Sequence, residues 1–247
     1  MKPQNVVRYF GATENIKETI KMFTEINSAE TWEKLLSEAK NGNNLAQFEV
    51  GIYYENGIEI DGVEILKAND LEGFNWTKKA YENGNLKALV SYADYLSLGK
   101  SCEKNLDLAI ELYKKGIELG ISEASYNLGI EYRNQQNFET AFEYYEKANE
   151  LDSNYEEFTI AKCYYYGIGI EKNKNKAFEL LKKIKFPENN QFEVDEANYL
   201  IGIIHLEGEI VEKSIELARK YLELANIDED HRSAQELLLI IGRSENL

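Results

Sequence analysis

The stretch 124–155, ASYNLGIEYRNQQNFETAFEYYEKANELDSNY, predicts two amphipathic helices joined by a polar turn. Small residues lie where the two helices would face each other, so the backbones can approach closely, and tyrosines fill the space beside them. These positions are Gly129, Tyr132, Ala141, Tyr145 and Ala148. A helical hairpin of this size cannot bury its apolar face alone, so we expect neighbouring hairpins of the same kind.

The pattern around Gly129 recurs along the chain, at intervals of 42, 36, 32 and 41 residues. A small residue stands at each reference position: Gly51, Ala93, Gly129, Ala161 and Gly202. A glycine follows six residues later in four of the five copies, and a second helix follows each turn. These second helices are expected over residues 70–83, 105–119, 138–151, 175–185 and 214–225. The chain therefore predicts about five helical hairpins.

Both ends of the repeat region are expected to carry capping helices. Residues 1–12 have no helical period and are expected to form an arm, and a helix is expected from about Thr13. Ser28 has the character of an N-cap for a second helix over 31–40. A last helix over 233–241 has no partner helix, so we expect it to close the other end of the stack.

Two regions follow from this division of the chain. Residues 1–30 are expected to be an N-terminal arm and capping helix, and residues 31–243 one continuous repeat unit. The long insertion 58–69, IEIDGVEILKAN, is apolar enough to pack on the stack or on another chain. Whether it is a contact loop or a passive excursion stays open at this point.

The repeats resemble the Sel1-like repeat, a relative of the tetratricopeptide repeat, in the pattern Ala-x-x-x-x-Gly-x-x-Tyr-x-x-Gly followed by a second helix. The matching pieces are AQFEVGIYYENG with WTKKAYENGN, ALVSYADYLSLG with LYKKGIELG, EEFTIAKCYYYGIGIEKNKNKA and EANYLIGIIHLEG. The hairpin at 124–155 has Gln135 in place of the turn glycine and resembles a plain tetratricopeptide unit. The resemblance implies an all-α fold, a right-handed α-solenoid with helical caps.

The chain has a strong acidic excess. It contains 28 basic and 44 acidic residues, which gives a net charge of −16. A field of that sign repels nucleic-acid backbone and anionic lipid, and it raises the encounter rate with cationic partners. Solubility alone would explain the same charge. We therefore expect no nucleic-acid or membrane partner.

The sequence predicts a cytoplasmic protein. Its first residues, MKPQNVVRYFGATEN, lack the apolar run of a signal peptide, and no apolar run reaches the length of a membrane span. Cys102 and Cys163 are two lone cysteines far apart in the chain, which we expect to be reduced.

No recognisable catalytic motif is present, so we expect no enzyme activity, no cofactor and no metal site. His205 occupies the tyrosine position of its repeat and is expected to be a partly buried, hydrogen-bonded ring. His231, in DEDHRS, is expected to be a solvent-exposed residue near a helix cap, and a metal site with Asp228 and Asp230 is disfavoured. The GIG motif at 167–169 follows a helix rather than a strand, so the repeat's own turn explains it better than a phosphate loop does.

The candidate binding surface is the concave groove that the first helices of such a stack are expected to line. Positions two before, two after and five after each reference residue share one helical stripe. The candidate partner-binding residues are Glu49, Tyr53, Asn56, Ser91, Tyr95, Asn127, Glu131, Asn134, Tyr166 and Glu207. These positions contain no lysine or arginine, which favours a basic ligand held by carboxylates and tyrosine rings. The alternative is that Tyr53 and Tyr95 only pack between adjacent first helices.

The sequence therefore predicts a non-catalytic protein-binding scaffold whose groove engages a basic protein. The resemblance implies a bacterial immunity or inhibitor protein that neutralises a cationic toxin. An adaptor for signalling or envelope assembly is the first alternative. A cell-wall-related enzyme or regulator is the second, although relatives of that kind carry paired cysteines in each repeat, which Cys102 and Cys163 do not supply. The sequence identifies neither the partner nor the oligomeric state.

Overall fold

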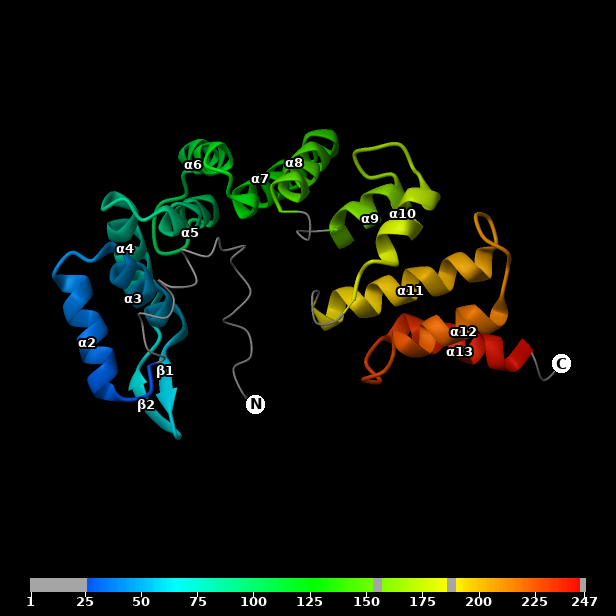
Figure 1. The fold of residues 1–247 in the computed structure, drawn as a ribbon, viewed down its shortest axis with the longest axis horizontal. Coiled ribbons are helices and arrows are strands. Elements are labelled where there is room, and N and C mark those ends of the chain that lie inside the picture. Colours follow the sequence, from blue (N-terminus) through cyan, green and yellow to red (C-terminus); the bar gives the residue numbers. More distant parts are fainter. Residues whose placement is uncertain (1–25, 153–156, 186–189, 245–247) are drawn as a thin grey trace. The chain divides into compact units, whose positions relative to one another are not determined.

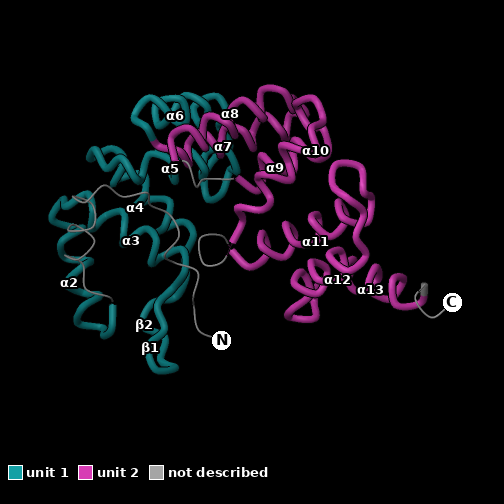
Figure 2. Tube along the Cα trace, turned by 45° about the vertical axis from the view of Figure 1, so that its right-hand side comes forward, with its two compact units in different colours: residues 1–120 teal, residues 121–247 magenta. Residues whose placement is uncertain are grey.

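The structure is a computed structural model that describes residues 26–152, 157–185 and 190–244. The chain divides into two compact units, Met1–Gly120 (unit 1) and Ile121–Leu247 (unit 2), which Figure 2 shows in different colours. The expected arm and the helix expected from Thr13 lie outside the described residues. The expectation that 31–243 form one continuous unit stays a prediction.

The described part of the chain contains twelve helices, α2 to α13, and one small sheet (Figure 1). The elements of unit 1 are α2 (Ala29–Lys40), α3 (Asn44–Asn56), β1 (Ile58–Ile60), β2 (Val63–Leu66), α4 (Asp70–Glu82), α5 (Leu86–Leu98) and α6 (Leu106–Glu118). Those of unit 2 are α7 (Ser122–Asn134), α8 (Phe138–Leu151), α9 (Glu157–Tyr166), α10 (Lys174–Leu181), α11 (Gln191–Glu207), α12 (Ile215–Leu224) and α13 (Arg232–Ser244).

Each first helix packs against the second helix that follows it in the chain. The pairs are α3–α4 and α5–α6 in unit 1, and α7–α8, α9–α10 and α11–α12 in unit 2. Helix α2 packs on α3, and α13 packs on α12. The five predicted hairpins and the all-α fold are confirmed, and the predicted second helices agree with the observed ones to within a few residues.

Short polar side chains start the second helices. Four of these helices are capped by Asn69, Asn105, Asn137 and Asn173, whose Oδ1 atoms accept backbone N–H bonds of 3.1, 3.1, 3.3 and 2.9 Å. Ser214 caps α12 in the same way, over 3.1 Å. The predicted cap at Ser28 is confirmed, since Thr31 N donates to Ser28 Oγ over 3.2 Å. Each cap satisfies a backbone donor that the first turn of a helix leaves open.

The reference glycines set the spacing between the paired helices. A Cβ on Gly129 would lie 2.6 Å from the ring of Tyr145 and 3.1 Å from the carbonyl oxygen of Ala141. In unit 1, a Cβ on Gly51 would lie 2.7 Å from Thr77 Oγ1. The close approach predicted for the hairpin 124–155 is therefore confirmed. In unit 1, Gly51 likewise allows its helix to approach the paired helix closely.

The insertion 58–69 forms the β-hairpin β1–β2. Ile60 pairs with Val63 across an Asp-Gly turn whose φ angles are 50° and 80°. These angles match a two-residue turn of type I′, which suits the twist of the flanking strands. The apolar side chains that pack with the core of α2 and α3 are Ile58, Ile60, Ile65 and Leu66. The apolar side chains of the insertion therefore pack on the stack.

His205 is a buried residue of α11, with 8% of its surface exposed. Its ring stacks on Tyr221 of α12 at a centroid distance of 5.8 Å and meets Phe178 of α10 edge-on at 5.9 Å. Its Nδ1 atom is buried and has no hydrogen-bond partner among the described residues. The expected burial is confirmed, whereas the expected hydrogen bond is absent at this nitrogen.

We expect His205→Phe to raise the free energy of unfolding by about 1 kcal/mol, because it removes a buried polar atom without a partner and keeps the ring contacts. Urea unfolding followed by circular dichroism measures the effect. His231→Phe is the comparison: it also removes a buried nitrogen, Nε2, that has no hydrogen-bond partner within the described part of the chain, but it loses the bond of 3.2 Å that Nδ1 accepts from Ala234 N, so it should stabilise less than His205→Phe does. A loss of stability in His205→Phe would show that Nδ1 is satisfied in solution.

Candidate partner-binding surfaces

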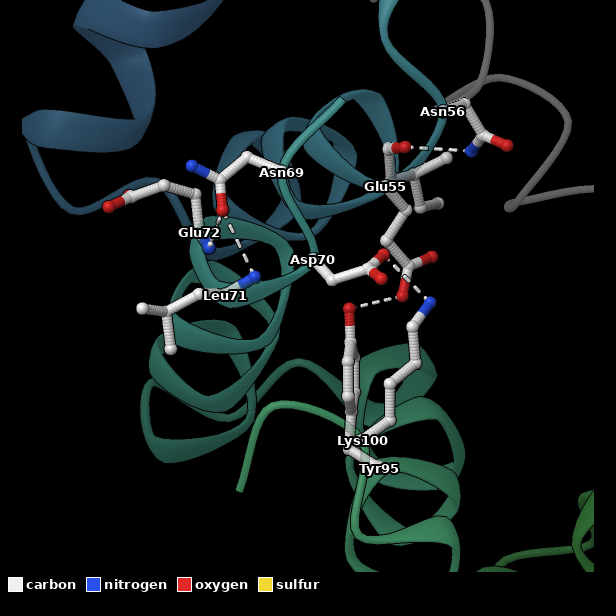
Figure 3. A network of polar contacts seen from close by, with 9 residues as sticks. Glu55, Asn56, Asn69, Asp70, Leu71, Glu72, Tyr95 and Lys100 are labelled. Carbon is white, nitrogen blue, oxygen red and sulfur yellow. Dashed lines mark hydrogen bonds and ion pairs between the residues drawn. The ribbon is translucent and has the colours of Figure 1, made fainter. Parts of the chain in front are cut away.

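Tyr95, one of the predicted groove residues, is an internal residue of unit 1. Its side chain starts from α5 and is only 3% exposed, and its hydroxyl donates a hydrogen bond to Glu55 of α3 (Figure 3). Its ring meets Phe74 of α4 edge-on, with the centroids 5.4 Å apart. Burial raises the pKa of the Tyr95 hydroxyl, and the hydrogen bond to the Glu55 carboxylate raises it further. Tyr95 thus joins three helices, as the packing alternative expects.

The turn that follows α5 covers the same tyrosine. Lys100 Nζ lies 2.9 Å from Asp70 Oδ1 and 5.8 Å from the centre of the Tyr95 ring. Figure 3 shows the two side chains beside each other, Tyr95 reaching Glu55 and Lys100 reaching Asp70. Cys102 Sγ donates to the carbonyl oxygen of Tyr95 over 3.3 Å. These contacts hold the ends of α3, α4 and α5 together.

The other predicted residues of unit 1 are more accessible. Asn56 is exposed, and its Nδ2 donates to the carbonyl oxygen of Ile52 over 2.8 Å. Tyr53 is half-buried and lies edge-on against Trp32 at 6.0 Å. Glu49 and Ser91 are half-buried on α3 and α5. This part of the predicted surface therefore offers an amide and small polar groups beside one partly covered ring.

The predicted residues of unit 2 differ widely in exposure. Glu131 is buried, with 9% exposed, whereas Tyr166 at the end of α9 is 56% exposed. Asn134 is exposed at the end of α7, and Asn127 is half-buried on the same helix. Glu207, at the end of α11, is exposed but accepts a bond of 2.7 Å from Lys174 Nζ. Tyr166 is the most accessible aromatic group of the predicted set.

Lysines just outside the predicted positions lie close to the predicted carboxylates. Burial raises the pKa of Glu49, and the charge of Lys87 opposes this rise. Lys174 binds both Glu207 and Glu209, over 2.7 and 2.6 Å, and these bonds raise the pKa of its ammonium group. The predicted surface is therefore less anionic than its own ten positions imply.

Arginine and lysine also lie near the one cysteine of the predicted stripe. Burial raises the pKa of Cys163 to about 11, and the charges of Lys162 and Arg133 act in the opposite direction. Cys163 and Cys102 are both free thiols. The raised pKa makes Cys163 an unreactive, structural thiol.

A group of acidic and aromatic residues in unit 2 forms a second candidate surface, which we call the acidic-aromatic surface. Its members are Tyr166 of α9, Asp195, Glu196 and Tyr199 of α11, and Asp228 and Asp230 of the loop before α13. Burial raises the pKa of Tyr166, and Glu196 and Tyr199 raise it further. Burial also raises the pKa of Asp195, and the negative charges of Asp228 and Asp230 add to that rise. Helix α11 and the loop before α13 are in contact here, since Tyr199 and Glu196 both lie against His231, at 4.8 and 3.4 Å.

His231 lies beside this surface and is not the exposed residue that the sequence suggested. Its side chain is 11% exposed, and its ring lies 4.8 Å from that of Tyr199. Its Nδ1 accepts from Ala234 N, so the expected position near a helix cap is confirmed. Its Nε2 lies 3.4 Å from Glu196 Oε1. The contact with the tilted ring of Tyr199 explains why the His231 ring is covered although the neighbouring residues 228–230 are exposed.

Only Tyr166 of the acidic-aromatic surface was among the residues predicted from the sequence. Helix α11 has 17 residues where most first helices have 13, so Asp195 and Glu196 extend before the stripe that the repeat defines. The acidic run DEDH at 228–231 is the sequence signal for this surface. Within the described residues, no group of three or more potential ligands could hold a metal ion.

A membrane-spanning helix is recognised by its length and its hydropathy. None of the described helices has the length and apolar character that crossing a bilayer requires.

Paired helices with small residues at their contacts, repeated along the chain, define an α-solenoid repeat protein. The Sel1 repeat model matches residues 44–85, 86–121, 160–184 and 195–226, and the tetratricopeptide repeat model matches 122–155. The Sel1 matches together cover more than half of the chain, which therefore belongs to the Sel1 repeat family. The plain tetratricopeptide character of the hairpin 124–155 is confirmed as well. Such repeats form scaffolds that typically bind proteins and are generally not catalytic.

Solved structures agree with this assignment at the level of the fold. A protective antigen of uropathogenic Escherichia coli with an SLR fold is 22% identical, with a TM-score of 0.69 over 87% of this chain. A Sel1 repeat protein from Oxalobacter formigenes is 20% identical, with a TM-score of 0.67, over 92% of this chain and 87% of its own. The chain spans only 45% of the antigen's length.

An immunity protein from Pseudomonas aeruginosa is 21% identical over 77% of this chain and 67% of its own, with a TM-score of 0.46. At that score the likeness supports no argument about function. No curated protein matches the chain.

Proposed function

We propose that this protein is a non-catalytic cytoplasmic scaffold that binds a basic protein, and that the acidic-aromatic surface makes the central contact. The observation that carries the proposal is the contact between α11 and the loop before α13: the His231 ring lies 4.8 Å from Tyr199 and 3.4 Å from Glu196 Oε1, which brings the exposed Asp228 and Asp230 to the end of α11 that carries Asp195, where their like charges repel. A lysine or arginine from a partner would relieve this repulsion and form charge-assisted hydrogen bonds. The exposed ring of Tyr166 offers a face on which a guanidinium group stacks.

A narrower proposal is that the partner is a cationic toxin and that this protein neutralises it as an immunity or inhibitor protein. The net charge of −16 supports fast, electrostatically steered association with a cationic partner. The absence of a recognisable catalytic motif in the sequence fits a protein that acts by occupying a surface. Association rather than turnover is therefore the property to measure.

The test begins with affinity capture from the source organism and mass spectrometry, followed by association kinetics with the purified partner. We expect the association rate to fall by about tenfold between about 50 and about 300 mM salt. The variant Asp228→Asn with Asp230→Asn should lower the rate at low salt, because both carboxylates are exposed and attract the partner.

The matched control for this test is Glu212→Gln with Glu216→Gln, which removes the same charge from exposed positions near the start of α12. It should change the rate by less than about twofold, since general net charge contributes little when the contact is local. Equal effects of the two double variants would refute the assignment to the acidic-aromatic surface. A salt-independent rate would refute the basic partner.

A further inference from the structure

A groove in unit 2 lies between two segments that are far apart in the sequence. One wall is formed by residues 136–139, at the end of the α7–α8 connection and the start of α8, and the other is the turn 167–171 after α9. The open space between them has a volume of about 590 Å³. The second wall contains the GIG motif at 167–169, for which the sequence offered only a role in the repeat's turn.

The two walls are held against each other by backbone contact. Gly169 has a φ of +70°, and a Cβ added to it would lie 1.9 Å from the carbonyl oxygen of Phe138. Asn137 fixes the start of α8 by accepting a bond of 3.3 Å from Thr140 N. Because glycine alone fits this contact, the groove is formed before any ligand arrives.

The side chains of the groove combine apolar surface with negative charge. Phe138 is 43% exposed and Ile170 is 36% exposed, one on each wall. Glu139 and Glu171 also stand on opposite walls, are exposed, and form no ion pair with another described residue. The residues that line the groove include no lysine or arginine.

Two positive groups lie near Glu139 and Glu171: the N-terminal end of α8 and Lys172. Glu139 lies in the first turn of α8, where its carboxylate offsets the positive end of the helix dipole. Lys172 follows Glu171 in the sequence but is not among the residues that line the groove. The lining of the groove therefore contributes two carboxylates and no cation.

We propose that this groove binds an extended segment of a partner protein in which arginine or lysine alternates with apolar residues. The cation would lie between Glu139 and Glu171, and the apolar side chains would cover Phe138 and Ile170. The groove shares no residue with the acidic-aromatic surface, so it gives the scaffold a second contact with the basic partner, and in this respect the inference rests on the proposed function. Charge-assisted hydrogen bonds to the two carboxylates supply the affinity. The apolar walls favour a segment in which apolar residues alternate with the basic ones.

The test uses a blocked fluorescent hexapeptide in which leucine alternates with arginine, with fluorescence anisotropy of the full chain as the readout. A peptide with citrulline in place of arginine should bind about tenfold more weakly, because it keeps the shape and loses the charge. Glu139→Gln with Glu171→Gln should weaken binding of the arginine peptide by about tenfold. Phe138→Ala should weaken it by about threefold through lost apolar contact.

The control Glu212→Gln with Glu216→Gln again removes two exposed charges, one of them in the first turn of a helix as Glu139 is. It should change the dissociation constant by less than about twofold. An equal loss in this control would show that the peptide responds only to the net charge, and an unchanged affinity in the groove variant would also overturn the proposal. Loss only in Asp228→Asn with Asp230→Asn would move the peptide to the acidic-aromatic surface and leave the proposed function standing.

Discussion

Replacing Tyr95 with alanine is expected to lower the free energy of unfolding by about 3–5 kcal/mol. The side chain is 3% exposed, so its removal leaves a cavity between α3, α4 and α5. The substitution also removes the donor that binds Glu55. Urea unfolding followed by tryptophan fluorescence is a suitable measurement, since Trp32 and Trp76 both belong to unit 1.

Two further variants separate the causes of this loss. Tyr95→Phe keeps the ring and removes only the hydroxyl, and it should lower the free energy of unfolding by about 1–2 kcal/mol. Tyr166→Ala, followed by circular dichroism because Tyr166 lies in unit 2, removes a tyrosine that is 56% exposed and should change stability by less than about 1 kcal/mol. If Tyr95→Ala is as stable as Tyr166→Ala, then Tyr95 is not a packing residue. It would then return to the set of candidate binding residues.

The fold could be predicted from the sequence because its determinants are local and repeated. Gly51 and Gly129 stand at helix contacts that admit no Cβ without displacement, and the sequence displays that requirement directly. The β-hairpin was also readable in principle, because Asp61-Gly62 between alternating apolar residues is the usual signal for a two-residue turn. The strands are only three and four residues long, so their period of two is too short to stand out against the helical period of the repeats.

The candidate surfaces were harder to predict because charge and exposure depend on neighbours in space. The predicted stripe contains no cation, yet Lys87 acts on Glu49 and Lys174 binds Glu207 from positions outside the stripe. The repeat pattern assigns Tyr53 and Tyr95 the same role, but one is half-buried and the other buried. A repeat specifies which backbone positions face each other, while the ends and turns of the helices decide which side chains stay accessible.

Gly169→Ala is the second substitution for which we expect a large loss of stability. It should lower the free energy of unfolding by about 2–5 kcal/mol. Two penalties combine, because the left-handed φ of +70° disfavours any side chain and the new Cβ would meet the carbonyl oxygen of Phe138. The turn after α9 must move away from the start of α8. Circular dichroism should report the loss, and amide hydrogen exchange should locate it in α8, α9 and α10.

Gly84→Ala distinguishes steric contact from backbone strain. Gly84 has a comparable φ of +84°, but a Cβ there would meet no atom within 4 Å. Only the left-handed penalty of about 1–2 kcal/mol remains at that position. The tryptophan signal of unit 1 should respond to Gly84→Ala and stay nearly unchanged in Gly169→Ala, because both tryptophans lie in unit 1. Equal losses in the two variants would mean that residues 136–139 and the turn 167–171 are not in contact in solution, and the groove between them would then lose its rigid wall.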